Sequence, residues 1–234
     1  DCSRTDLTVL PMTIRFGDEE YLDGVNLTHR QFYEKMIETQ VLPTTSQPSP
    51  YAFEAAIRKI HEQGDIALII TISSKLSGTW QSANIAAAET GGEVVETLNH
   101  EKENLRVIAL LDTLEYLQKG GRISKTVAIA GSLLSIKPVV SVVDGEVALL
   151  GKARGSRQGN NFLIQQIQKD GIDFSRPFFL GYTGLSDALL QKYISDSAEI
   201  WKEHVEHLPI GTIGGAIGTH VGPGAIAVAF FTEK

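Results

Sequence analysis

The sequence predicts an α/β protein of two domains: an N-terminal parallel-sheet α/β domain and a C-terminal α+β domain with a six-stranded, mostly antiparallel sheet. Up to about residue 90, candidate helices alternate with apolar, strand-like segments, as in a parallel sheet covered by helices. Beyond residue 104, strand-like segments follow one another and several are joined by turn signals, which favours antiparallel pairing. We therefore expect domains at 1–104 and 105–234.

The first N-terminal elements are a strand and a capped helix. Residues 7–16 alternate loosely, which predicts a strand. A helix should start after Thr28, because Thr28 and Gln31 form a capping box. The apolar face of this helix is expected to consist of Phe32, Met36 and Ile37.

A second helix and a second strand follow. Ser49 has the position of an N-cap, with Pro50 at the first helical position. This helix should direct Phe53, Ile57 and Ile60 inward. Residues 66–72 form a continuous apolar run, which is typical of a strand buried on both faces. The polar segment 73–79 and an alanine-rich helix come next.

The C-terminal half contains mainly strands. They are expected at 106–111, 138–143, 146–152, 177–183, 213–220 and 225–231. Asp144-Gly145, between the second and third of these, is a strong signal for a two-residue hairpin turn. Helices are expected from Ser124 towards Leu134 and from about Ser186.

Composition and net charge restrict the partners and the cellular location that we expect for the protein. The net charge of −7 argues against nucleic acid as the main partner, because phosphate binding needs a basic surface. Cys2 is the single cysteine, so no internal disulfide can form and a reducing cytoplasm is the expected location. No apolar run approaches the roughly 20 residues that span a bilayer, and the first residues do not resemble a signal peptide.

Three polar loops are candidates for a binding site: 44–48, 73–79 and 214–225. The second lies at the carboxyl end of a predicted strand and before a helix, where open α/β sheets bind ligands and backbone N–H groups favour an anionic head group. The third is rich in glycine and contains His220, which could donate to a ligand or titrate near neutral pH. Each loop by itself also has an ordinary interpretation as a turn.

Other residue patterns are less informative. Arg122 follows Gly120-Gly121 and could be a plain loop cation or a contact for an anion or a partner. His204 and His207 lack a third ligand nearby, so no metal site is expected. No Gly-x-Ser-x-Gly elbow, phosphate-binding loop or dinucleotide-binding glycine motif is present. The residues alone therefore predict a polar site between two domains.

Six short stretches, in order along nearly the whole chain, resemble the motifs of the DegV family. They are Tyr21-Leu22-Asp23-Gly24, Thr45-Ser46-Gln47-Pro48-Ser49, Ser73-Ser74-Lys75-Leu76-Ser77-Gly78-Thr79, Leu114-Glu115-Tyr116-Leu117-Gln118-Lys119-Gly120-Gly121-Arg122-Ile123, Ile136-Lys137-Pro138 and Gly218-Thr219-His220-Val221-Gly222-Pro223-Gly224-Ala225. Any one of them is a weak signal, whereas the ordered set is specific.

The resemblance implies a fatty-acid carrier without a cofactor or a catalytic residue of its own. A long-chain fatty acid of the palmitate, stearate or oleate type would lie in a tunnel between the two domains. Some DegV members are the lipid-carrying subunit of a fatty acid kinase, in which a separate ATP-using subunit converts the presented carboxyl group to an acyl phosphate. A kinase subunit is therefore an expected partner, and transient membrane contact is compatible with this role.

The resemblance also assigns residues to the site. It implies that Thr45 and Ser77 hold the carboxyl group and that His220 belongs to the same network. Arg122 is the candidate contact for the kinase subunit. The supporting residues are expected to be Ser46, Gly78, Thr79, Gly218 and Thr219.

The chain departs from the family pattern in two places. The helix expected after Asp1-Cys2-Ser3 is shortened, and only residues 89–104 stand where the family has a further strand and helix. We expect that segments are omitted, because losing a central strand would expose buried faces. Two other functions stay open: an acyl hydrolase or transferase with Ser77 as nucleophile and His220 as base, and a domain that senses a small molecule.

Overall fold

The computed structural model describes residues 6–96, 103–124 and 136–233. The C-terminal part is built on one sheet, whose strands are β6 (Leu105–Leu110), β7 (Ile136–Val143), β8 (Glu146–Arg154), β9 (Phe179–Tyr182), β10 (Ile210–Thr212) and β11 (Ile226–Phe231). The six strands lie in the order β10-β9-β11-β6-β7-β8. β9 and β10 pair in parallel and the other neighbours are antiparallel, which confirms the predicted sheet.

The hairpin predicted from Asp144-Gly145 is confirmed. Val143 of β7 pairs with Glu146 of β8, so the two residues between them form the whole turn. Asp144 and Gly145 both have positive φ, 50° and 78°. Two such residues in succession match the right-handed twist of the flanking strands, which is why this dipeptide predicts hairpins so well.

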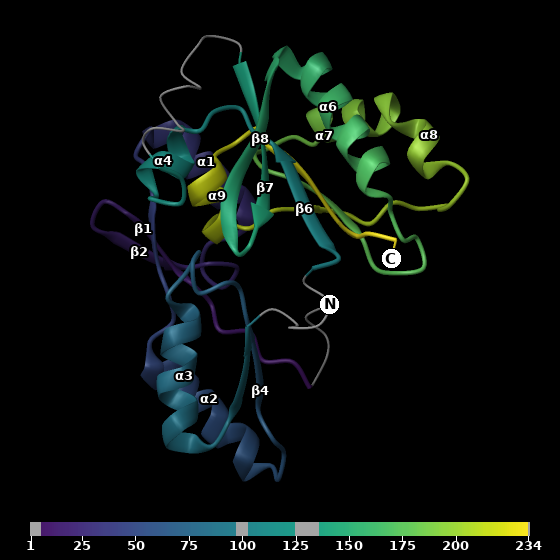
Figure 1. Ribbon diagram of the computed structural model, residues 1–234. Coiled ribbons are helices and arrows are strands. Elements are labelled where there is room, and N and C mark those ends of the chain that lie inside the picture. Colours follow the sequence, from purple (N-terminus) through teal and green to yellow (C-terminus); the bar gives the residue numbers. More distant parts are fainter. Residues whose placement is uncertain (1–5, 97–102, 125–135, 234) are drawn as a thin grey trace.

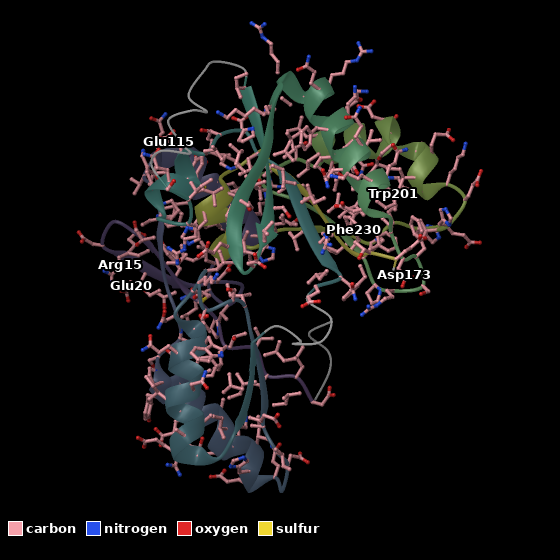
Figure 2. The ribbon with its side chains drawn as sticks, in the orientation of Figure 1. Arg15, Glu20, Glu115, Asp173, Trp201 and Phe230 are labelled. Atoms are coloured by element: carbon pink, nitrogen blue, oxygen red, sulfur yellow. The ribbon has the colours of Figure 1, made fainter. Side chains whose placement is uncertain are left out.

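One face of the sheet carries the main hydrophobic core. The helices α6 (Gly155–Asp170), α7 (Ala188–Asp196) and α8 (Ala198–Trp201) belong to this part of the chain. In β11 the residues alternate, so that Ile226, Val228 and Phe230 are buried in this core together with Leu163 of α6 and Trp201 of α8. Phe230 and Trp201 are labelled in Figure 2.

The N-terminal part contains two small sheets. The first is antiparallel, in the order β2-β1-β3, with β1 (Thr13–Phe16), β2 (Glu19–Leu22) and β3 (Thr44–Ser46). Helix α1 (His29–Thr39) has the predicted capping box of Thr28 and Gln31. Ile37 of this helix is exposed and Tyr33 is buried instead, since Tyr33 lies on the same face as Phe32 and Met36. Residues 7–12, expected to be strand, are not.

The second small sheet is parallel, as predicted, but has two strands, β4 (Leu68–Thr71) and β5 (Glu93–Glu96). It belongs with α2 (Pro50–Glu62) and α3 (Thr79–Thr90). Ser49 caps α2 through its side chain, as expected, and Phe53 and Ile57 are buried. The predicted boundary near residue 104 falls between β5 and β6 and stays a prediction.

The prediction that residues 66–72 are buried on both faces is wrong. Ile66, Leu68, Ile70 and Ile72 form an outer row of β4 and its flanks that is 83%, 61%, 64% and 56% exposed. Ala67 and Thr71 on the opposite side are buried, and Ala67 packs with α2 and α3. The described residues cover one side of β4, and an apolar run does not reveal how many sides a fold covers.

The strand predicted at 213–220 is also wrong. The structure has β10 before it and then a short helix, α9 (Gly215–Val221), that ends beside His220. The glycines in this segment weakened the helical pattern, and tertiary contacts decide the conformation. The helix expected from Ser124 towards Leu134 falls at 125–135, outside the described residues.

Figure 1 shows how these parts are arranged. β6, β7 and β8 lie beside α6, α7 and α8 in the larger, upper part, and α2, α3 and β4 form the smaller, lower part. β1, β2, α1 and α9 lie where the two parts meet, close to α4 (Glu115–Lys119). Tyr116 of α4 packs against the buried cluster of β1 and α1, so this junction has its own hydrophobic core.

Candidate functional site

The three polar loops predicted from the sequence meet at this junction. Thr45 lies in β3, where it pairs with Ile14 of β1. His220 lies in the last turn of α9. The Thr45 hydroxyl oxygen is 3.1 Å from Nε2 of His220, although the two residues are 175 positions apart in the sequence. The structure therefore brings together two of the three predicted head-group residues by a direct hydrogen bond.

The surroundings of His220 keep its imidazole neutral. Its Nδ1 is buried and has no hydrogen-bond partner among the described residues. Burial, together with the positive charge of Arg122, lowers the pKa of His220 from 6.5 to about 4. A neutral imidazole has one N–H donor and one lone pair, and the Thr45 hydroxyl can complement either tautomer at Nε2.

Gly120 is placed against the same ring. A β-carbon at Gly120 would lie 2.2 Å from Nδ1 of His220, a distance that real side chains do not reach. Glycine is therefore required here by the close approach of the backbone to the imidazole. The sequence contained Gly120 in a motif, but nothing in the local pattern connected it with His220.

Arg122 joins the second loop to the segment around Gly120. Its Nε donates to the carbonyl oxygen of Leu76 at 3.0 Å, and its guanidinium also donates to the carbonyl oxygen of Gly120. The side chain is half-buried. It thus ties the backbone just before Ser77 to the segment that covers His220. These contacts are internal, and the expected role of Arg122 in partner binding stays a prediction.

Ser77 is buried and lies two residues before α3. Its hydroxyl oxygen is 2.8 Å from that of Thr79 and accepts from the Thr79 backbone N–H at 3.3 Å. The Thr79 hydroxyl also approaches Sδ of Met12, at 3.9 Å. Ser77 and Thr79 therefore form a hydroxyl pair that can donate to and accept from a ligand.

The loop of Thr45 and the loop of Ser77 are in contact. Gln47 donates from Nε2 to the hydroxyl oxygen of Ser82 in α3 at 3.0 Å. A β-carbon at Gly78 would lie 2.3 Å from Oε1 of Gln47, so glycine allows this approach. Ser46, between Thr45 and Gln47, is exposed and points to the opposite side of β3 from Thr45.

The glycines and the threonine of α9 serve its packing. A β-carbon at Gly218 would lie 2.6 Å from the hydroxyl of Tyr33. The Thr219 hydroxyl is buried and donates to the carbonyl oxygen of Gly215 at 2.9 Å. Gly218 and Thr219 therefore support the helix that carries His220. Among the hydrogen bonds of the described residues, that of the Thr219 hydroxyl goes to Gly215, and those of the Thr45 and Ser77 hydroxyls go to His220 and Thr79.

Ser77 and His220 do not form the hydrogen-bonded pair of a nucleophile and its base in the described part of the chain. Among the hydrogen bonds of the described residues, Ser77 pairs with Thr79 and His220 pairs with Thr45, and none joins Ser77 to His220. A serine hydrolase needs that bond to activate its nucleophile. The described residues also contain no group of three or more His, Cys, Asp or Glu side chains that could hold a metal ion. None of their helices is long and apolar enough to span a membrane.

Fold and site together define a class: an α/β protein in which neutral hydroxyl and imidazole groups from two parts of the chain meet at their junction. The sequence pattern of the DegV family, a family of uncharacterised proteins, matches residues 2–95 and 90–233. The chain belongs to the DegV family.

Relatives agree with this assignment. A DegV domain-containing protein of Caldanaerobacter subterraneus is 30% identical, and the match covers 97% of this chain and 91% of that protein. Its alignment extends over 261 positions, more than the 234 residues of this chain, so the relative has segments without a counterpart here.

Solved structures share the fold. A DegV family protein of Thermus thermophilus, described as fatty acid binding, is 27% identical with a TM-score of 0.82, over 95% of this chain and 91% of that one. The fatty acid kinase B3 protein of Streptococcus pneumoniae, solved loaded with linoleic acid, is 21% identical with a TM-score of 0.79, over 95% and 90%. The latter likeness shows the fold alone.

Proposed function

We propose that this protein binds one long-chain fatty acid at the junction and holds its carboxyl group on Thr45, Ser77 and His220. The observation that carries the proposal is the Thr45–His220 hydrogen bond beside the Ser77–Thr79 hydroxyl pair. The fatty acid binding described for the Thermus thermophilus relative supports it. The sequence resemblance assigned the same three residues to the carboxyl group.

The acyl chain would lie along the face of the six-stranded sheet opposite α6 and α7. On this face Ala227 and Ala229 of β11 and Ala109 of β6 are partly exposed, although both strands are central in the sheet. Ala227 and Ala109 pair directly, so the small side chains are neighbours. β11 starts six residues after His220, which connects this apolar face with the polar cluster.

Burial of the acyl chain would supply most of the affinity. A palmitate-sized tail has about 15 carbons, and at about 0.8 kcal/mol each their transfer from water contributes about 12 kcal/mol before ordering costs are subtracted. The polar cluster therefore needs only to orient the carboxyl group. Hydroxyls suit this role better than an arginine clamp, because a bidentate ion pair would resist handing the group on.

We further propose that the protein presents this carboxyl group to an ATP-dependent kinase subunit, which would convert it to an acyl phosphate. The fatty acid kinase B3 protein of Streptococcus pneumoniae has the same fold. A serine or threonine hydroxyl can donate to a carboxylate and equally to an acyl phosphate, so one cluster can serve both. Arg122, beside the cluster, is our candidate for contact with the kinase subunit.

Denaturing extraction of the purified protein followed by mass spectrometry tests the binding proposal. We expect one equivalent of fatty acid per chain. Ala227→Phe should reduce this amount strongly by filling the apolar face, whereas Ala88→Phe on the exposed side of α3 should not. Absence of lipid, together with failure to bind added fatty acid, would refute the proposal. Ester turnover by the isolated protein would favour the hydrolase alternative instead.

A further inference from the structure

We propose that Asp23 is a positioning residue of this site: it fixes the first turn of α9 and so holds His220, at the other end of α9, against Thr45. The inference deepens the proposed function and rests on it for one of its two readouts.

The Asp23 carboxylate binds the free N–H groups at the start of α9. Oδ1 accepts from the backbone N–H of Gly215 at 3.1 Å, and Oδ2 accepts from that of Ala216 at 2.8 Å. The first N–H groups of a helix have no partner within it, and a carboxylate there is favoured by charge as well as by hydrogen bonding. The partner comes from a residue about 190 positions away, in the N-terminal part.

The helix depends on this support because it is short. α9 has seven residues, and a helix of this length does not persist without tertiary contacts. The Tyr33 hydroxyl donates to the carbonyl oxygen of Ile213 at 2.8 Å, just before the helix. Gly215 lies so close to Ile14 that a β-carbon would come within 2.5 Å of it. Asp23, Tyr33 and Ile14 therefore determine where α9 begins.

The partners of both ends of α9 are attached to the same strand, β1. The backbone N–H of Asp23 donates to the carbonyl oxygen of Met12 at 2.9 Å, immediately before β1. Thr45 pairs with Ile14 of β1. Seven helical residues span about 10 Å. Because Asp23 holds the start of α9 and the length of the helix is fixed, His220 is placed beside Thr45. Without the Asp23 hydrogen bonds, the start of α9 would no longer be held and His220 could move away from Thr45.

The competing explanation is that Asp23 merely stabilises the fold. A purely structural role predicts that Asp23→Ala lowers the free energy of unfolding without a specific effect on His220. A positioning role predicts that the effect of Asp23 on the site disappears once His220 has been removed. A double-mutant cycle separates the two explanations.

The cycle consists of Asp23→Ala, His220→Ala and the double variant, measured in the full chain. The first readout is the rate at which palmitate labelled with ¹³C at its carboxyl carbon leaves the protein for acceptor vesicles of phosphatidylcholine. We expect each single variant to accelerate release by about tenfold, as for loss of one head-group hydrogen bond, and the double variant to be no faster than His220→Ala. Asp23→Asn, which keeps one acceptor oxygen, should give an intermediate rate. Asp18→Ala, in the exposed turn of the same hairpin, is the matched control and should leave the rate unchanged.

The second readout needs no lipid. In ¹⁵N NMR of the histidine side chains, the Nε2 signal of His220 should move in Asp23→Ala towards that of the exposed His207, while His207 itself stays in place. Additive effects in the cycle, or an unchanged His220 signal in a folded Asp23→Ala protein, would overturn the inference. If Asp23→Ala does not fold, Asp23→Asn carries the same comparison. Absence of fatty acid binding in the wild type would refute the proposed function alone, since the NMR comparison would still test Asp23.

Discussion

The two sheets that contain long apolar strands, β4–β5 and the six-stranded sheet, differ in what covers them. In β11 the residues Ile226, Val228 and Phe230 are buried beneath helices, and Ala227 and Ala229 between them are partly exposed on the opposite face. In β4 the inner side packs on α2 and α3, while Leu68 and Ile70 of the outer row are more than half exposed. Both segments are as apolar as a strand that is buried on both faces. Composition therefore shows which faces a strand could bury, whereas the surrounding elements decide which faces are buried.

The largest expected effect is a difference between the two sheets in how much an alanine substitution lowers the free energy of unfolding. Phe230→Ala removes a fully buried ring from the C-terminal core and should lower the free energy of unfolding by about 3–5 kcal/mol. Leu68→Ala, on the outer row of β4, should change it by no more than about 0.5 kcal/mol. Urea unfolding of the two variants measures both values. Similar losses would show that the outer row is covered in solution.

The junction between the two parts should respond to pH through His220. Its pKa is about 4 in the folded protein and 6.5 ordinarily, so the unfolded chain binds the proton first as pH falls. The contribution of neutral His220 to the free energy of unfolding is therefore fully present above about pH 6.5. It is lost as the pH falls from 6.5 to 4, which lowers the free energy of unfolding by about 1–2 kcal/mol after allowance for partial exposure.

The matched variant for this prediction is His220→Asn. The difference in the free energy of unfolding between wild type and variant, measured at pH 7.5 and 4.5, isolates His220 from the carboxylates that titrate in the same range. An equal pH dependence in both proteins would mean that the imidazole is solvated, and with it that the two parts are less tightly joined than the Thr45 contact indicates.

A smaller effect at the same junction should distinguish orientation of the carboxyl group from affinity for the fatty acid. Ser77→Ala removes one hydroxyl, worth about 0.5–1.5 kcal/mol, while leaving the apolar face intact. We expect fatty acid retention to fall by less than about tenfold and transfer to a kinase subunit to fall further. Retention is measured by extraction and transfer by acyl phosphate formation. Equal losses in the two assays would contradict this division of roles.

The smallest effect concerns the outer row of β4 alone. Ile70→Thr keeps a β-branched side chain and should change the free energy of unfolding by less than about 0.5 kcal/mol, with unchanged fatty acid content. Ile57→Thr, in the buried cluster of α2, is the matched substitution and should be clearly destabilising. A large decrease in the free energy of unfolding of Ile70→Thr would instead show that a further element packs on this row.

Local signals determined the elements whose causes are local. The capping box of Thr28, the N-cap Ser49 and the turn Asp144-Gly145 were all predicted and confirmed, because each depends on residues within a few positions. Five of the six strands of the large sheet were also predicted near their observed positions, whereas β10 at 210–212 replaces the strand predicted at 213–220. The ordered motifs added the family, and with it the expectation that Thr45, Ser77 and His220 belong together.

The tertiary structure decided everything that depends on contacts between distant segments. It made residues 215–221 a helix where the sequence predicted a strand, and Asp23 supplies the missing hydrogen-bond partners at the start of that helix. It left one side of β4 exposed, since no neighbouring element of the described chain covers that side. It also turned Arg122 inward onto Leu76 and placed Gly120 against His220. The sequence by itself determined most of the elements, the family and the residue types of the site. Only the packing of segments up to 193 residues apart decided the remaining elements and the geometry of the site, because hydrogen-bond partners and burial across such separations leave no local pattern.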